Sequence, residues 1–188
     1  AFPFQPDAEI SLEANPATLT PQKLEGYRGA GINRLSLGIQ SLDAGQLRRL
    51  GRLHSPDEAR QALLSARRAG FDNISADIMF ALPGQSREAL LGDIRELAAE
   101  VEHLSCYGLS IEEDTPFYHL HRRGDLDMPS EDHYAEHFLA VDDALSASGM
   151  RHYEISNYAR PGRECRHNLA YWRRTTCLAL GAGAHAFY

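Results

Sequence analysis

The sequence has no long apolar run, few cysteines and no excess of positive charge. Its longest apolar stretches fall well short of the roughly 20 residues that a membrane-spanning helix needs, so we expect no membrane span. Residues 1–4 have neither a basic start nor an apolar core, so we expect no signal peptide. The formal net charge of −7 argues against nucleic-acid binding, which depends on basic patches that displace counterions.

The three cysteines, Cys106, Cys165 and Cys177, form no Cys-x-x-Cys pair and are odd in number. This usage indicates a reducing compartment with free thiols rather than a disulfide framework, and we expect the cytoplasm. With 43% hydrophobic and 24% charged residues, the 188-residue chain has an ordinary globular composition. It is long enough for one well-filled core.

Four short apolar runs are present, and each ends in polar residues that a core does not require. The runs cover residues 8–12, 34–39, 74–76 and 104–109, and they end at Glu13, Gln40, Asp77 and near Ser110 and Glu112. Helical segments separate the runs, so the chain repeats a strand and a helix, which predicts an α/β fold with a parallel sheet. The carboxyl ends of parallel strands meet at one edge, where ligands bind in such folds. We therefore expect Glu13, Gln40 and Asp77 to surround one shared site.

Capping and turn residues predict where the elements begin and end. Helices are expected after Thr20, Ser55, Ser86 and Ser130, with a short one at residues 44–50. A fifth strand is expected at residues 151–155, residues 112–129 form a long loop or a small excursion, and the tail from residue 156 is irregular apart from a helical segment near residues 165–172. Five strands do not close an eight-stranded barrel, so the sheet is open or the chain is a piece of a larger protein.

Three further features carry alternative interpretations. Arg52, just after Gly51, is placed to bind a carboxylate or phosphate, or it is a surface charge. His133 and His137 match the H-x-x-E-H pattern of one class of zinc peptidases, but they also flank an apolar helix face and no third ligand is evident. His167, close to the only tryptophan, has the setting of an axial haem ligand or of a packed corner.

Eight segments together resemble a known family, the oxygen-independent coproporphyrinogen III oxidases among the radical S-adenosylmethionine (SAM) proteins. These segments are residues 12–16 (LEANP), 34–41 (RLSLGIQS), 50–54 (LGRLH), 76–85 (ADIMFALPGQ), 105–107 (SCY), 111–113 (IEE), 152–162 (HYEISNYARPG) and 165–172 (CRHNLAYW). The last segment resembles the haem-chaperone branch of the family. The resemblance covers nearly the whole chain.

The resemblance implies a partial open (β/α)₆ barrel at residues 1–155, with its first βα units missing, followed at residues 156–188 by the start of a C-terminal family-specific region. It implies that Glu13 contacts the SAM bound to a [4Fe–4S] cluster, and that Gln40, Arg52 and Asp77 line the second-SAM or substrate side of the same cavity. Ile111 would add an apolar contact there, and His167 would dock haem.

Two departures from the family pattern bear on activity. The family holds its cluster with a Cys-x₃-Cys-x₂-Cys loop, and the scattered cysteines of this chain do not form one. We therefore read the chain as an internal fragment that does not reduce SAM by itself. Ala170 also stands where the chaperone branch usually has asparagine, and an arginine-rich stretch follows at residues 173–176.

The resemblance leaves two functions open for the full-length protein. In the first, it binds SAM, the cluster and haem, and passes haem to an accepting protein. In the second, it is an oxidase that converts coproporphyrinogen III to protoporphyrinogen IX by radical oxidative decarboxylation of two propionates, with a porphyrinogen as its partner. The segment at residues 165–172 favours the chaperone.

Overall fold

The computed structural model describes residues 5–186. Residues 1–4, where no signal peptide is expected, lie outside this range. The strands are β1 (Ser11–Ala14), β2 (Arg34–Gln40), β3 (Ile74–Phe80), β4 (His103–Gly108), β5 (Arg151–Glu154) and β6 (Asn157–Ala159). The helices are η1 (Pro16–Thr18), α1 (Pro21–Gly29), α2 (Ala44–Arg49), α3 (Pro56–Arg68), α4 (Arg87–Glu100), α5 (Pro116–Arg122), α6 (Glu131–Ala147) and α7 (Arg166–Trp172).

The predicted alternation of parallel strands and helices is confirmed for β1 to β4. These strands lie in sequence order and every neighbouring pair is parallel. The predicted caps also form: the Thr20 hydroxyl accepts from the Lys23 amide, and Ser55 and Glu58 make a reciprocal capping box. The expected α/β fold with a parallel-rich sheet is therefore present.

The far edge of the sheet is antiparallel, which the sequence did not indicate. The strand β6 lies between β4 and β5 and is antiparallel to both. The expectation of an irregular tail from residue 156 is therefore wrong at its start. There, Asn157, Tyr158 and Ala159 pair with β4. The short helix α5 likewise replaces part of the loop expected at residues 112–129. The division into residues 1–155 and 156–188 stays a prediction.

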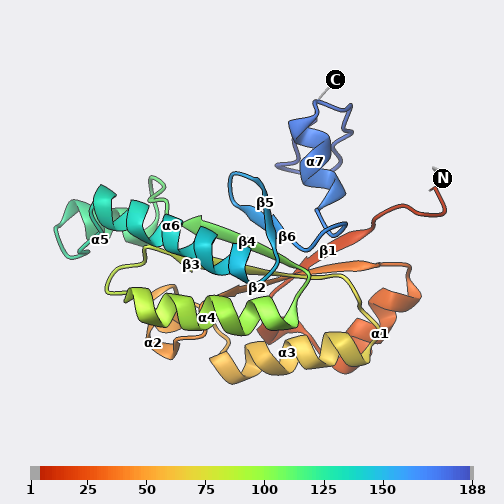
Figure 1. The fold of residues 1–188 in the computed structure, drawn as a ribbon, viewed down its shortest axis with the longest axis horizontal. Helices are drawn as coiled ribbons and strands as arrows, with labels where there is room; N and C mark the ends of the chain where they lie inside the picture. The colour runs from red at the N-terminus through yellow and green to blue at the C-terminus, as the bar shows by residue number, and fades with distance from the viewer. Residues whose placement is uncertain (1–4, 187–188) are drawn as a thin grey trace.

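One face of the strands carries the hydrophobic core. Fully buried apolar side chains on β2 and β3, among them Leu37, Ile74 and Ile78, pack with Leu24, Leu63 and other residues of the helices that cover this face. In Figure 1, α3 and α4 lie on one side of the sheet and α7 on the other. Among residues 5–186, no helix has both the length and the apolarity that crossing a bilayer requires.

Candidate functional site

The opposite face of the same strands is polar. Side chains alternate across a strand, so the residues between the core positions of β1 to β4 share this second face. They include Ser36, Ser75, Asp77, His103 and Ser105, and they line two hollows that share Glu13 and Asp77. The sheet therefore separates an apolar, helix-covered side from a polar side with room for ligands.

The first hollow, which we name the rim pocket, has a volume of about 410 Å³ and lies at the carboxyl ends of the strands. It is lined by Glu13, Ala14, Asn15, Gly38, Gln40, Arg52, Asp77 and Tyr107. Four of the residues that the sequence singled out, Glu13, Gln40, Arg52 and Asp77, are thus brought together. The common direction of the strands accounts for Glu13, Gln40 and Asp77, whereas Arg52 comes from the loop after α2.

Gln40 is held firmly at the last position of β2. Its side chain is buried, and its Oε1 accepts a hydrogen bond from the Tyr107 hydroxyl at 2.9 Å. Its backbone φ of 72° lies in the left-handed region, which non-glycine residues rarely adopt. Arg52 donates from Nη1 to Asn15 Oδ1 at 3.3 Å on the other side of the pocket. The Gln40 amide group and the Arg52 guanidinium therefore both face the rim pocket.

Gly38 lines the rim pocket and has no side chain to fill it. A Cβ atom at this position would lie 3.2 Å from Gln40 Nε2 and 3.3 Å from Asn15 Oδ1. Any larger residue would therefore occupy the space between these two side chains. The bare backbone at Gly38 leaves room for a ligand to approach β2 closely.

Electrostatics in the rim pocket favour a ligand with a positive group. Burial raises the pKa of Asp77, and the nearby Glu13 carboxylate raises it further, whereas hydrogen bonds from Ser105 and Ser36 lower it. The Ser36 hydroxyl donates to Asp77 Oδ1 at 3.4 Å. An ammonium or sulfonium group nearby stabilises a buried carboxylate that has a second carboxylate beside it. The residues present therefore fit SAM, which carries both of these cationic groups.

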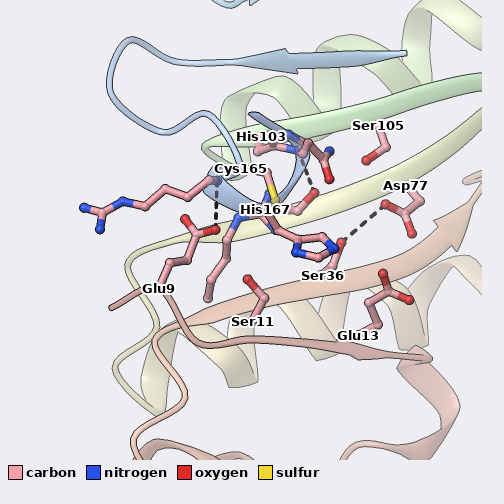
Figure 2. Close-up of a pocket in the computed structure, with 13 residues that line it drawn as sticks. Glu9, Ser11, Glu13, Ser36, Asp77, His103, Ser105, Cys165 and His167 are labelled. Atoms are coloured by element: carbon pink, nitrogen blue, oxygen red, sulfur yellow. Dashed lines mark hydrogen bonds between the residues drawn. The ribbon is translucent and has the colours of Figure 1, made fainter. Parts of the chain in front are cut away.

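The second hollow, which we name the strand-face cavity, has a volume of about 660 Å³ and lies under the start of α7. It is lined by Glu9, Ser11, Glu13, Arg34, Ser36, Ser75, Asp77, His103, Ser105, Cys165, Arg166, His167 and Asn168. Figure 2 shows the His167 imidazole projecting over the strand face that carries Ser11, Ser36 and Asp77. Its volume lies within the roughly 300–1,000 Å³ typical of small-molecule sites.

A buried hydrogen-bond chain fixes the segment that carries His167. His103 shares one hydrogen bond with the Ser75 hydroxyl and another with the Tyr153 hydroxyl, both at 2.8 Å. The Tyr153 oxygen in turn accepts from the Cys165 amide at 3.4 Å and from Asn168 Nδ2 at 3.3 Å. Burial and the charge of Arg34 lower the pKa of His103 to about 3, so this imidazole is neutral. The chain therefore connects β3 and β4 to the start of α7 without adding charge.

Sequence reasoning missed Arg34 and His103. Both stand near the amino-terminal ends of their strands, whereas the prediction concentrated on the carboxyl ends. The available signal was strict alternation, because Arg34 and Ser36 flank the core residue Leu35 and His103 and Ser105 flank Leu104. Ile111 lies beyond the end of β4, is half-buried and lines neither hollow, so its proposed contact stays a prediction.

The zinc-peptidase interpretation finds no support in the geometry. His137 is fully buried, and its Nδ1 accepts a hydrogen bond from the Ala81 amide at 3.3 Å, so this nitrogen is not free for a metal. Within residues 5–186, no three His, Cys, Asp or Glu side chains converge on a common point. His133 and His137 instead lie on the face of α6 next to β3.

The cysteines do not fit a [4Fe–4S] cluster. Cys106 is buried in the core, and burial raises its pKa far above the ordinary value, which disfavours the thiolate that iron needs. Cys165 is buried beside α7 and Cys177 lies in the tail, and all three are free thiols. No step through a cluster can therefore be assigned to cysteines of this chain.

Comparisons with known proteins agree with this architecture. The family model of the radical SAM superfamily matches residues 4–125. The solved structure of coproporphyrinogen III oxidase (HemN) from Escherichia coli superposes with a TM-score of 0.79 at 24% identity, over 99% of this chain and 46% of that one. At this identity the likeness concerns the fold.

Curated relatives give a closer match in sequence. Heme chaperone HemW of Bacillus subtilis is 40% identical over 96% of this chain, and HemW of Escherichia coli is 41% identical over 98% of it. In both comparisons the aligned region is 48% of the relative, so the chain spans about half the length of the curated relatives it matches. Because the family model covers more than half of the chain, and the fold and the polar strand ends agree with it, the chain belongs to the radical SAM superfamily.

Proposed function

We propose that the protein containing this chain is a haem chaperone, which binds haem and passes it to an accepting protein. The observation that supports this most is that His167 lines the same cavity as Glu13 and Asp77, next to the rim pocket. The 40–41% identity to proteins named heme chaperone adds to it. The free cysteines are consistent with a reducing compartment, and we take the cytoplasm as the place of action.

In this proposal, haem enters the strand-face cavity and His167 supplies an axial nitrogen ligand to its iron. The His167 side chain is exposed and its ring meets the edge of Tyr171, with ring centroids 4.9 Å apart. An exposed imidazole fixed by an aromatic neighbour is accessible to a flat ligand, and histidine is a common axial ligand of haem.

The rim pocket is proposed to hold SAM. Superfamily membership implies SAM and a [4Fe–4S] cluster. Glu13 and Asp77 would bind its cationic groups, and Arg52 would bind its carboxylate. Gln40 would contact its polar atoms, and Ile111 would add an apolar contact. SAM bound there supplies the adenosyl group on which radical chemistry in this superfamily depends, and the chain's contribution is to orient it.

A haem titration tests this proposal. Haem added to the chain should give a saturable change in the Soret band, and His167→Ala should weaken binding by at least about tenfold, because a direct iron ligand is lost. His121→Ala is the matched control, since His121 lies on α5 and lines neither hollow. The absence of a Soret change with the unaltered chain, or identical binding by His167→Ala, would contradict the proposal.

The oxidase alternative is supported only by likeness in fold, which does not assign a reaction. An anaerobic assay of the reconstituted longer protein with coproporphyrinogen III distinguishes the two. Formation of deoxyadenosine and protoporphyrinogen IX would favour the oxidase, whereas haem transfer without either product would favour the chaperone.

A further inference from the structure

Arg34 is a buried cation close enough to Asp77 to lower the pKa of that carboxyl group, yet two of its own nitrogen atoms have no hydrogen-bond partner. It begins β2, its side chain is 3% exposed, and it lines the strand-face cavity. Its Nε and Nη2 atoms are buried and have no hydrogen-bond partner among the described residues. None of the ion pairs found within residues 5–186 includes Arg34.

Burial of these two nitrogen atoms is unfavourable unless a ligand accepts hydrogen bonds from them. A guanidinium has five N–H donors, and each donor that is buried without an acceptor lowers the stability of the fold. The neutral His103 beside it cannot supply a negative charge. Arginine is also suited to bind a carboxylate through two parallel hydrogen bonds.

Arg34 lies closer to the amino-terminal ends of the strands than Glu13 and Asp77 do. In the parallel register of β1 and β2, Arg34 pairs with Ser11, and Ser36 pairs with Glu13. Arg34 therefore lies two residues before the level of Glu13, which is roughly 7 Å along the strand. Ser11 is level with Arg34, His103 is level with Glu13, and Asp77 lies further along the strands. The Glu9 carboxylate also lines the cavity.

We propose that Arg34 is a carboxylate-binding residue of the strand-face cavity and receives a propionate of the tetrapyrrole whose iron His167 binds. This inference rests on the proposed function for the identity of the ligand. The same chemistry would serve the amino-acid carboxylate of SAM, whose site adjoins the cavity through Glu13 and Asp77, so the test separates the two sources of the carboxylate.

The test compares each ligand with a form that lacks the carboxylate. Haem, haem dimethyl ester, SAM and decarboxylated SAM are titrated into the unaltered chain, into Arg34→Gln and into Arg34→Lys. We expect Arg34→Gln to weaken haem binding by at least about tenfold, because a charge-assisted pair is lost. Arg34→Lys keeps the charge but loses the planar guanidinium that forms two parallel hydrogen bonds. It should therefore restore part of the affinity for haem. Binding of the dimethyl ester should be the same in all three proteins.

Arg49→Gln serves as the control for loss of an arginine from the fold, because Arg49 donates to the Pro83 carbonyl and lines neither hollow. If the Arg34 variants do not fold, the unaltered chain still decides, since it should prefer haem to the ester by about tenfold. A loss of SAM affinity in Arg34→Gln, with decarboxylated SAM unaffected, would assign the carboxylate to SAM instead.

The outcomes separate the two proposals. If haem does not bind the unaltered chain, the proposed function fails, and the SAM pair alone then decides whether Arg34 binds a carboxylate. If haem binds and Arg34→Gln binds every ligand as the unaltered chain does, the role of Arg34 is overturned and the chaperone proposal stands.

Discussion

The two faces of β1 to β4 differ completely in chemistry although they alternate residue by residue along the same strands. On one face, Leu35 and Leu37 are fully buried in the core, and on the other, Arg34 and Ser36 line the strand-face cavity. A slip of one residue in register would exchange the two sets. One face of the strands therefore contributes mainly to stability and the other to ligand binding. Substitutions at neighbouring positions should have different consequences.

The largest expected effect separates the two faces in stability. Leu37→Ala should lower the free energy of unfolding by about 3 kcal/mol, because it opens a cavity in a fully buried core. Ser36→Ala, one residue away, should lower it by less than about 1 kcal/mol, because only one long hydrogen bond is lost. Urea unfolding measures both. Equal losses would mean that the two faces are not distinct in packing.

A smaller effect concerns the glycine under the rim pocket. Gly38→Ala should lower the free energy of unfolding by about 1 kcal/mol, because its Cβ crowds Gln40 and Asn15. Gly92→Ala on the exposed side of α4 is the matched control and should raise it by up to about 1 kcal/mol, since alanine favours a helix and nothing lies near its Cβ. Thermal unfolding of both variants measures the difference, and stabilisation by Gly38→Ala would contradict the close approach.

The smallest effect depends on pH and concerns Asp77. Because burial raises its pKa in the folded chain above the unfolded value of 3.8, the folded state holds the proton more tightly. The stability contributed by the neutral acid is therefore present below pH 3.8 and is lost as the pH rises through the raised pKa. Asp77→Asn should be more stable than the unaltered chain at pH 7, with the difference vanishing below pH 3.8.

Unfolding at several pH values measures this difference. If Asp77→Asn is less stable than the unaltered chain at pH 7, the neighbours of Asp77 stabilise its carboxylate by more than burial destabilises it. Ser86→Ala, which removes a helix cap remote from both hollows, should lower stability by the same amount at every pH.

Local sequence signals predicted most of the scaffold. Thr20 and Ser55 cap helices as their spacing indicated, and the apolar runs before Glu13, Gln40 and Asp77 form adjacent parallel strands. These features depend on neighbours a few residues away or on a repeated strand–helix order. Their convergence in the rim pocket followed from the direction of the strands alone.

Features set by distant contacts were not predictable in this way. The strand β6 is only three residues long, and it forms because Asn157, Tyr158 and Ala159 pair with β4, about fifty residues earlier. The link from His103 to Tyr153 and the start of α7 likewise joins segments with no sequence pattern in common. Such pairings depend on tertiary packing, which local periodicity does not encode.

The polar strand face and the start of α7 line one cavity, which we propose as the haem site. A crystal structure of the chain with haem bound tests it most directly. We expect the porphyrin over the strands between Glu13 and Arg34, with its iron on His167 and a propionate at Arg34. A porphyrin bound instead against the exposed apolar side chains Trp172, Leu178 and Leu180 would contradict the account.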